Sequence, residues 1–296
     1  MFKKLATQLS LLLLYPLSCY VMADNLNLIK QWQTESHLKQ PESVVYDIMR
    51  RSIYVSNING EPSAADGNGF ISLIANDGKI EKLKWIDGLN APKGMAMLGK
   101  KLFVTDINEL LVIDVETAKI SKRFKADDKS FLNDVAVTSS GVIYVTDTVN
   151  NRIYRLYQGK LEMWLEDPKL ENPNGLYIDN KYIIVGSWGT PTDGWRTDIP
   201  GHIVLISPED KHIKDFADGS PIGNLDGLAR YDNNSFLVTD WMQGELKLVK
   251  SDGQVVTLLE LGQGSADILY QRSRNLLLIP QMSKGNLVAY TLKTSE

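Results

Sequence analysis

The chain has 296 residues, of which 43% are hydrophobic and 23% are charged. This composition is ordinary for a soluble globular protein and allows a substantial buried core. The formal net charge is −4, from 32 basic and 36 acidic residues, and the sequence has no Lys/Arg cluster. Nucleic-acid binding, which requires a basic face, is therefore not expected.

The first 23 residues have the pattern of an export signal. Lys3 and Lys4 give a positive start, and an apolar run follows from Leu9 to Leu14. Val21-Met22-Ala23 then fits a small-residue cleavage site. An uncleaved membrane anchor and a lipoprotein attached through Cys19 are alternatives, although the apolar run is short for a membrane span. We expect residues 1–23 to be a signal peptide and the mature protein, residues 24–296, to be periplasmic or secreted.

Cleavage at this point would also limit the chemistry of the mature protein. It would remove the only cysteine, so that no disulfide, thiol nucleophile or thiolate metal site is possible. It would also remove two lysines and move the formal charge from −4 to −6. Export without disulfides is feasible because a chain of this size can be stabilised by its core. No other stretch is apolar enough to cross a membrane.

An internal repeat determines the predicted fold. Six segments share a polar pair, a short alternating strand, a turn and a second apolar strand, and they begin at positions 41, 92, 132, 173, 225 and 265. Their starts are Pro41-Glu42-Ser43, Pro92-Lys93-Gly94, Leu132-Asn133-Asp134, Pro173-Asn174-Gly175, Leu225-Asp226-Gly227 and Ser265-Ala266-Asp267. Third and fourth strands follow, such as those at 152–157 and 161–165. Four short strands repeated six times predict an all-β, six-bladed β-propeller with four antiparallel strands per blade.

The last repeat has no room for a fourth strand before the chain ends. The strand-like segment from Leu28 to Thr34 precedes the first repeat, and we expect it to supply the missing strand and close the ring. Closure leaves only short, protected sheet edges. The alternative is a β-sandwich or two barrels, which would not require a period near 40 residues. One domain is expected to cover residues 24–296.

Two repeats are about eleven residues longer than the others, in each case between the second and third strands. The extra residues lie in 57–69 of the first repeat and 187–201 of the fourth. These repeats are opposite each other in a six-fold ring, so the two loops should flank one mouth of the channel, where binding groups often lie. The second loop carries Trp188, Trp195 and Arg196, which we predict to contact a substrate. The alternative is that the tryptophans only pack the loop onto the rim.

The second residue of each repeat should face the channel at one depth. These six residues are Glu42, Lys93, Asn133, Asn174, Asp226 and Ala266. Two carboxylates and two amide oxygens would then converge, and such hard oxygen ligands suit calcium. The three histidines do not have the spacing of metal ligands. The alternative is a set of turn-forming residues, since Asn-Gly and Asp-Gly pairs are common in turns.

These motifs resemble the family of senescence marker protein, gluconolactonase and luciferin-regenerating enzyme, which is related to diisopropyl-fluorophosphatase and the paraoxonases. The resemblance implies that Glu42, Asn133, Asn174 and Asp226 hold one divalent cation, with calcium as the expected ion. Asn174 matches the family's Pro-Asn-Gly motif, and Asp226 matches its Asp-Gly-Leu-Ala motif. The resemblance covers the whole mature chain, because the blade period runs through it. The four motifs occur in the family's order, and they are spaced about one blade apart.

The sequence departs from the family pattern at two positions of the ring. Ser43 stands where the family often has glycine, and Lys93 joins the ring. A lysine at this depth would weaken cation binding, pair with Glu42 or Asp226, or meet an anionic substrate. The aspartates at Val-Thr-Asp strand ends, Asp106, Asp147 and Asp240, are expected to brace turns.

Two functions follow as hypotheses. The first, implied by the resemblance, is a metal-dependent hydrolase of a lactone or related ester, in which Asp226 acts as the catalytic residue that orients or deprotonates water. The second is a non-catalytic propeller that binds a small molecule or a partner protein, which Lys93 in the ring favours. Under either hypothesis we expect a monomer, and under the first its partner is a small-molecule substrate, with Lys93 contacting it.

Overall fold

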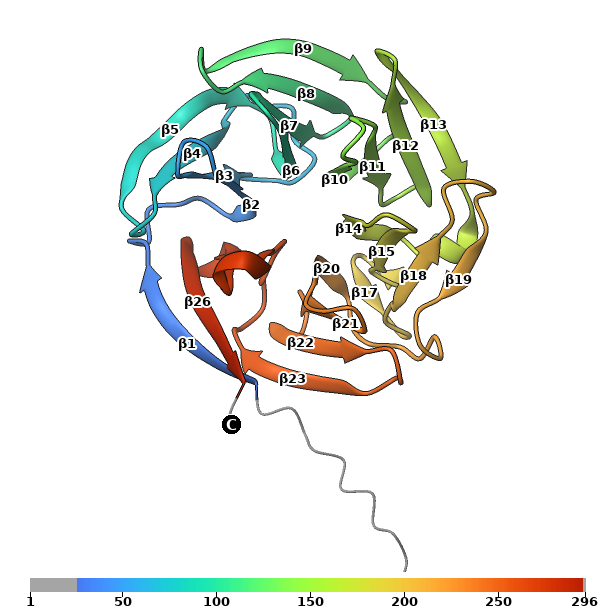
Figure 1. The fold of residues 1–296 in the computed structure, drawn as a ribbon. Helices are drawn as coiled ribbons and strands as arrows, with labels where there is room; N and C mark the ends of the chain where they lie inside the picture. The colour runs from blue at the N-terminus through green and yellow to red at the C-terminus, as the bar shows by residue number, and fades with distance from the viewer. Residues whose placement is uncertain (1–25, 295–296) are drawn as a thin grey trace, which may run out of the picture.

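Short strands separated by tight turns make up almost all of residues 26–294, the part of the chain that the computed structural model describes. They form six four-stranded antiparallel sheets arranged as blades around a central axis (Figure 1). The prediction of an all-β, six-bladed propeller is therefore confirmed. The predicted signal peptide lies outside the described residues.

Each blade runs from an inner strand at the axis to an outer strand at the rim. Blade 1 contains β2 (Pro41–Asp47), β3 (Ser52–Asn57), β4 (Gly69–Ala75) and β5 (Ile80–Leu89), and blade 2 contains β6 (Pro92–Leu98), β7 (Lys101–Asp106), β8 (Glu109–Asp114) and β9 (Lys119–Lys125). Blade 3 contains β10 (Leu132–Val137), β11 (Ile143–Asp147), β12 (Arg152–Tyr157) and β13 (Lys160–Glu166), and blade 4 contains β14 (Pro173–Ile178), β15 (Ile183–Ser187), β18 (Ile203–Ile206) and β19 (Ile213–Asp215). Blade 5 contains β20 (Leu225–Arg230), β21 (Ser235–Asp240), β22 (Glu245–Lys250) and β23 (Val255–Glu260).

Blade 6 combines both ends of the described chain. It contains β24 (Leu269–Gln271), β25 (Leu276–Gln281), β26 (Asn286–Thr294) and, on the outside, β1 (Leu26–Gln33). β1 pairs antiparallel with β26 from Leu26 opposite Thr294 to Gln33 opposite Val288. The two strands lie side by side in Figure 1, so the predicted closure of the ring by an N-terminal strand is confirmed.

Two elements lie outside the blade pattern. A small hairpin of β16 (Pro191–Asp193) and β17 (Arg196–Thr197) lies within the long loop of blade 4. Three 3-10 turns are described, at Pro168–Leu170, Arg272–Arg274 and Met282–Lys284. None of the helical segments among residues 26–294 has the length and apolar character needed to cross a membrane.

The core is divided among the spaces between neighbouring blades, each filled by its own apolar cluster. Val55 and Leu278, for example, belong to the cluster between blades 1 and 6. This arrangement follows from the sequence, because strands buried on both faces need apolar residues in succession. β11 and β15 are buried along their whole length, and each begins with three apolar residues in succession, Ile143-Tyr144-Val145 and Ile183-Ile184-Val185.

The inner strands of neighbouring blades are in close contact at the third residue of each repeat. Glycine occupies this place in blades 2, 4 and 5, as Gly94, Gly175 and Gly227. A Cβ added to any of them would lie closer than 3.0 Å to backbone atoms of the next blade. Glycine is therefore required there by backbone packing.

In the other three blades a polar side chain makes the same connection between blades. The Ser43 hydroxyl donates to Asp267 at 2.7 Å and accepts from the Met95 N–H at 3.2 Å. Asp134 accepts from the Leu176 N–H at 2.6 Å. Ser43, which departs from the family pattern, thus joins blades 6, 1 and 2.

The Val-Thr-Asp strand ends have the structural role that was predicted. Asp106 accepts from the Ala91 N–H at 2.7 Å, and Asp147 accepts from the Phe131 N–H at 2.9 Å. Asp240 accepts from the N–H groups of neighbouring turns and from Lys247 at 2.8 Å. These carboxylates brace the connections that lead into the ring positions.

The close approach of the inner strands gives a stability test. We expect Gly175→Ala to lower the free energy of unfolding by about 1–3 kcal/mol or more, because the added methyl group overlaps the backbone of Asp226. Gly186→Ala in the same blade is the matched control, since its nearest contact would be a side-chain atom at 3.3 Å. Urea unfolding of both variants measures the difference, and equal losses would contradict this account of the ring.

Candidate functional site

A cavity of about 280 Å³ lies at the mouth of the channel. Gly60 and Pro62 reach it from the long loop of blade 1, and Trp188 and Trp195 reach it from the long loop of blade 4. The prediction that the two long loops flank one mouth is therefore confirmed.

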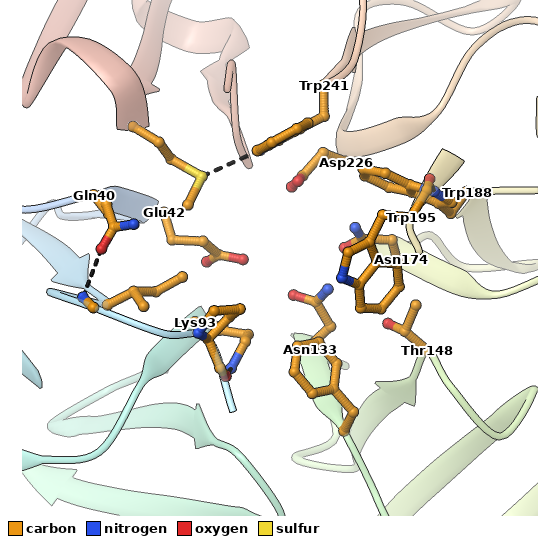
Figure 2. A pocket seen from close by; sticks show the side chains of 15 residues that line it. Gln40, Glu42, Lys93, Asn133, Thr148, Asn174, Trp188, Trp195, Asp226 and Trp241 are labelled. Atoms are coloured by element: carbon orange, nitrogen blue, oxygen red, sulfur yellow. Dashed lines mark hydrogen bonds between the residues drawn. The ribbon is translucent and has the colours of Figure 1, made fainter. Parts of the chain in front are cut away.

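The polar floor of the cavity is formed by the second residues of four inner strands. Glu42 on β2, Asn133 on β10, Asn174 on β14 and Asp226 on β20 all line it, and all four are buried. Figure 2 shows the ends of these side chains directed toward a shared centre. These four residues are called the floor ring below. The sixth position, Ala266, is buried but is not among the residues that line the cavity.

Three oxygen atoms of the floor ring have no hydrogen-bond partner among the described residues. They are Glu42 Oε2, Asn133 Oδ1 and Asp226 Oδ1, and each is buried. A buried acceptor without a partner costs about 1–3 kcal/mol, and more when it is charged. Three such acceptors facing one centre form a site that favours a cation or a hydrogen-bond donor.

The electrostatics of the floor ring also favour a cation. Burial raises the pKa of the Glu42 carboxyl well above its ordinary value, and the nearby Asp226 raises it further. Burial likewise raises the pKa of Asp226, which a hydrogen bond from the Asn174 amide partly offsets. A divalent cation would stabilise both carboxylates in their charged form, which a neutral water molecule cannot do.

Two further carboxyl groups lie behind the floor ring. Burial raises the pKa of Asp134 well above its ordinary value, and it raises that of Asp267 to about 7. Asp267 also adds to the rise in the pKa of Glu42 and of Asp226. The centre of the ring therefore holds more acidic groups than the second positions alone predicted.

The donor chemistry of the floor ring fits a hard cation. Two carboxylates and two amides offer oxygen only, which is the ligand type that calcium prefers. Within residues 26–294 no group of three or more His, Cys, Asp or Glu side chains is placed to hold a metal. A cation at the floor ring would therefore depend on the amide oxygens of Asn133 and Asn174.

Lys93 lines the cavity but is tied to the protein at its charged end. Its ammonium donates to the carbonyl of Pro62 at 2.8 Å and to that of Ala91 at 3.0 Å. It also lies 4.4 Å from the centroid of the Phe131 ring, as a cation–π contact. Burial lowers the pKa of Lys93 to about 8, against an opposing effect of Glu42 and Asp106. Lys93 thus anchors the long loop of blade 1 to blade 2.

Four aromatic rings form one wall of the cavity. Trp188 lies 5.8 Å from both Trp195 and Trp241 between ring centroids, and Phe131 lies 5.8 Å from Trp195. The Trp188 N–H donates to the carbonyl of Trp195 at 2.8 Å, which holds the loop in place. Both loop tryptophans therefore pack the rim and also line the cavity.

Some residues that line the cavity could not be predicted from the repeat, and one residue that was predicted to contact a substrate does not line the cavity. Arg196 lies exposed on β17 and is not among the lining residues. Phe131, Trp241 and Met282 line the cavity but were not predicted. They lie in connections between strands, at positions that the repeat does not define.

Comparisons with known proteins support the propeller architecture. No protein-family model matches the chain, and no curated protein is detectably similar to it in sequence. A gluconolactonase structure from Xanthomonas campestris is 15% identical with a TM-score of 0.65, over 90% of this chain and 89% of the other. A virginiamycin B lyase from Staphylococcus aureus is 15% identical with a TM-score of 0.58, over 90% and 99% of the two chains.

A third similar structure is described as an auxiliary nutrient binding protein. It comes from Bacteroides thetaiotaomicron and is 9% identical with a TM-score of 0.65, over 91% of this chain and 77% of the other. At these identities the likeness shows the fold alone. The likeness therefore agrees with the propeller fold that the resemblance implied, and membership of the gluconolactonase family stays a prediction.

The acidic centre predicts that stability depends on pH. A carboxyl group whose pKa is raised in the folded state stabilises the fold when protonated, and this contribution is lost as the pH rises through the folded pKa. For Asp267 that value is about 7. In the presence of a chelator, the melting temperature should therefore decrease as the pH is raised from 5 to 8. Added calcium should reverse much of this decrease.

Thermal denaturation across this pH range, with chelator and with calcium, measures the effect. We expect calcium to raise the melting temperature at pH 8 by a few degrees, since about 1 kcal/mol corresponds to about 2–4 °C in a domain of this size. Glu42→Gln and Asp226→Asn should each reduce the calcium effect. A melting temperature that is insensitive to calcium at every pH would contradict the site.

Proposed function

We propose that the protein is an exported hydrolase of a lactone or related ester that depends on a divalent cation at the floor ring. The observation that supports this most directly is the set of unpartnered oxygens of Glu42, Asn133 and Asp226. They face one cavity that is large enough for a small molecule and bounded by aromatic rings. The gluconolactonase among the similar structures is consistent with this reaction class.

In this proposal the residues of the floor ring have different roles. Glu42, Asn133 and Asn174 hold the cation together with Asp226. The cation supplies polarisation of a carbonyl oxygen when it is bound. Asp226, whose carboxylate the cation would keep in its charged form, takes a proton from the attacking water as the general base. The hydrogen bond from the Asn174 amide orients this carboxylate.

One observation favours a hydrolase over a lyase of the kind found among the similar structures. The virginiamycin B lyase is catalytically inactive when one of its histidines is replaced by alanine. None of the three histidines of this chain, His37, His202 and His212, is among the residues that line the cavity. Glu42 and Asp226 do line the cavity, and we assign proton transfer to a carboxylate here.

Binding without catalysis is the second candidate. The aromatic wall supports small-molecule binding in the absence of any reaction, and one similar structure is a nutrient binding protein. Lys93 no longer favours this candidate, because its ammonium is engaged by the carbonyls of Pro62 and Ala91. Turnover distinguishes the two candidates.

Hydrolysis of a lactone panel, with and without chelator, tests the proposal. We expect activity that chelator abolishes and calcium restores. Asp226→Asn should lower kcat/KM by about 10²-fold or more, the range associated with loss of a general base. Elemental analysis of the purified variants should show less bound metal in Glu42→Gln and Asp226→Asn.

Exposed acidic residues provide the matched controls for these variants. Glu81→Gln and Asp87→Asn remove one carboxylate each from the outer strand β5 and should leave both activity and metal content unchanged. Metal content that is the same in all four variants would remove the proposed site. A bound metal without turnover on any ester would instead favour the binding protein.

A further inference from the structure

The wall above the floor ring is mainly apolar. It is formed by Phe131, Trp188, Trp195, Trp241, Met282 and Pro62. Figure 2 shows the tryptophan rings on one side of the cavity and Lys93 with Gln40 on the other. A ligand seated on the floor ring would therefore have most of its body against rings and aliphatic groups.

The polar groups of this wall are already engaged within the protein. The Lys93 ammonium donates to the carbonyls of Pro62 and Ala91 and faces the Phe131 ring. Lys93 therefore does not offer its positive charge to an anionic substrate, which was one of the roles that its ring position suggested.

The indole and hydroxyl groups are engaged in the same way. The Trp188 N–H donates to the Trp195 carbonyl at 2.8 Å, and the Trp241 N–H donates to Met282 Sδ at 3.2 Å. The Thr148 hydroxyl donates to the carbonyl of Pro173 at 2.8 Å. These lining residues thus present ring faces and methyl groups to a ligand.

The side-chain donors that remain on the wall belong to Gln40 and Trp195, both exposed at the mouth. Gln40 Oε1 already accepts from the Gly60 N–H at 2.6 Å. Hydroxyl groups spread around a ligand would therefore be buried without partners, which opposes binding. An apolar or aromatic body would gain by leaving water and by stacking on the rings.

From this distribution we infer that the cavity selects a ligand with one polar head and an apolar or aromatic body. Polyhydroxylated lactones, such as sugar lactones, are disfavoured. The lactone or ester nature of the head rests on the proposed function, whereas the apolar nature of the body rests on the wall. The head faces the floor ring, and the body lies against Trp188, Trp195 and Phe131.

Two lactams that are not readily hydrolysed test the inference apart from turnover. One is a δ-valerolactam carrying a pentyl chain, and the other is a δ-valerolactam carrying hydroxyl groups on its ring carbons. Isothermal titration of the full mature chain in calcium measures both affinities. We expect the pentyl lactam to bind at least about 10-fold more tightly. Its chain has no polar group to bury, whereas the ring hydroxyls of the other lactam would be buried against the wall without partners.

Trp195→Ala shows whether the wall is responsible. This ring is 42% exposed, and the carbonyl that holds Trp188 is a backbone group that the variant keeps. We expect it to weaken pentyl-lactam binding several-fold, while Trp195→Phe retains most of the affinity. Tyr157→Ala, which removes an aromatic ring of similar exposure away from the cavity, should have no effect.

The outcomes separate the inference from the proposed function. Equal or tighter binding of the hydroxylated lactam, no binding of the pentyl lactam, or an affinity that Trp195→Ala leaves unchanged would overturn the inference. The two matching lactones are assayed for hydrolysis in parallel. Preference for the pentyl lactam without turnover of either lactone would contradict the hydrolase and leave the apolar selectivity in place.

Discussion

The close contact between successive inner strands is the constraint on which the rest of this structure depends. The third residue of each repeat is either a glycine that packs against the backbone of the next blade or a residue whose polar side chain is hydrogen-bonded to a neighbouring blade. This contact leaves little freedom in the distance of each inner strand from the axis. Five of the six second residues therefore line one cavity, although successive ones are separated by 40 to 52 positions in the sequence. The site follows directly from the closure of the ring.

The same constraint explains why the centre is electrostatically demanding. Glu42 and Asp226 are placed in a buried ring, with Asp134 and Asp267 behind them. Burial and mutual repulsion raise the pKa of these groups, so the fold alone favours their protonated forms. A bound cation would reverse that preference. Stability, proton binding and cation binding are thus expected to be linked through one set of side chains.

Most of the fold could be predicted from the sequence because a propeller repeats itself. Strand alternation and the period near 40 residues determine the blades, the closing strand and the face on which the long loops lie. The floor ring could be located for the same reason, since Glu42, Asn133, Asn174 and Asp226 occupy equivalent places.

What could not be predicted depends on side-chain direction and on irregular connections. The ring position of Lys93 did not reveal that its ammonium turns to the carbonyls of Pro62 and Ala91. Arg196 was grouped with Trp195 by sequence proximity, but the β16–β17 hairpin leaves it exposed outside the cavity lining. Phe131 and Met282 lie in connections between strands, where the repeat gives no signal.

The central claim is that one cation binds between four side chains from four blades. A crystal structure of the mature protein grown with a lanthanide in place of calcium tests this most directly, through the anomalous scattering of the ion. The account predicts one strong peak within coordinating distance of Glu42, Asn133, Asn174 and Asp226. A floor ring without a peak, in crystals whose surface sites are occupied by the ion, would contradict it.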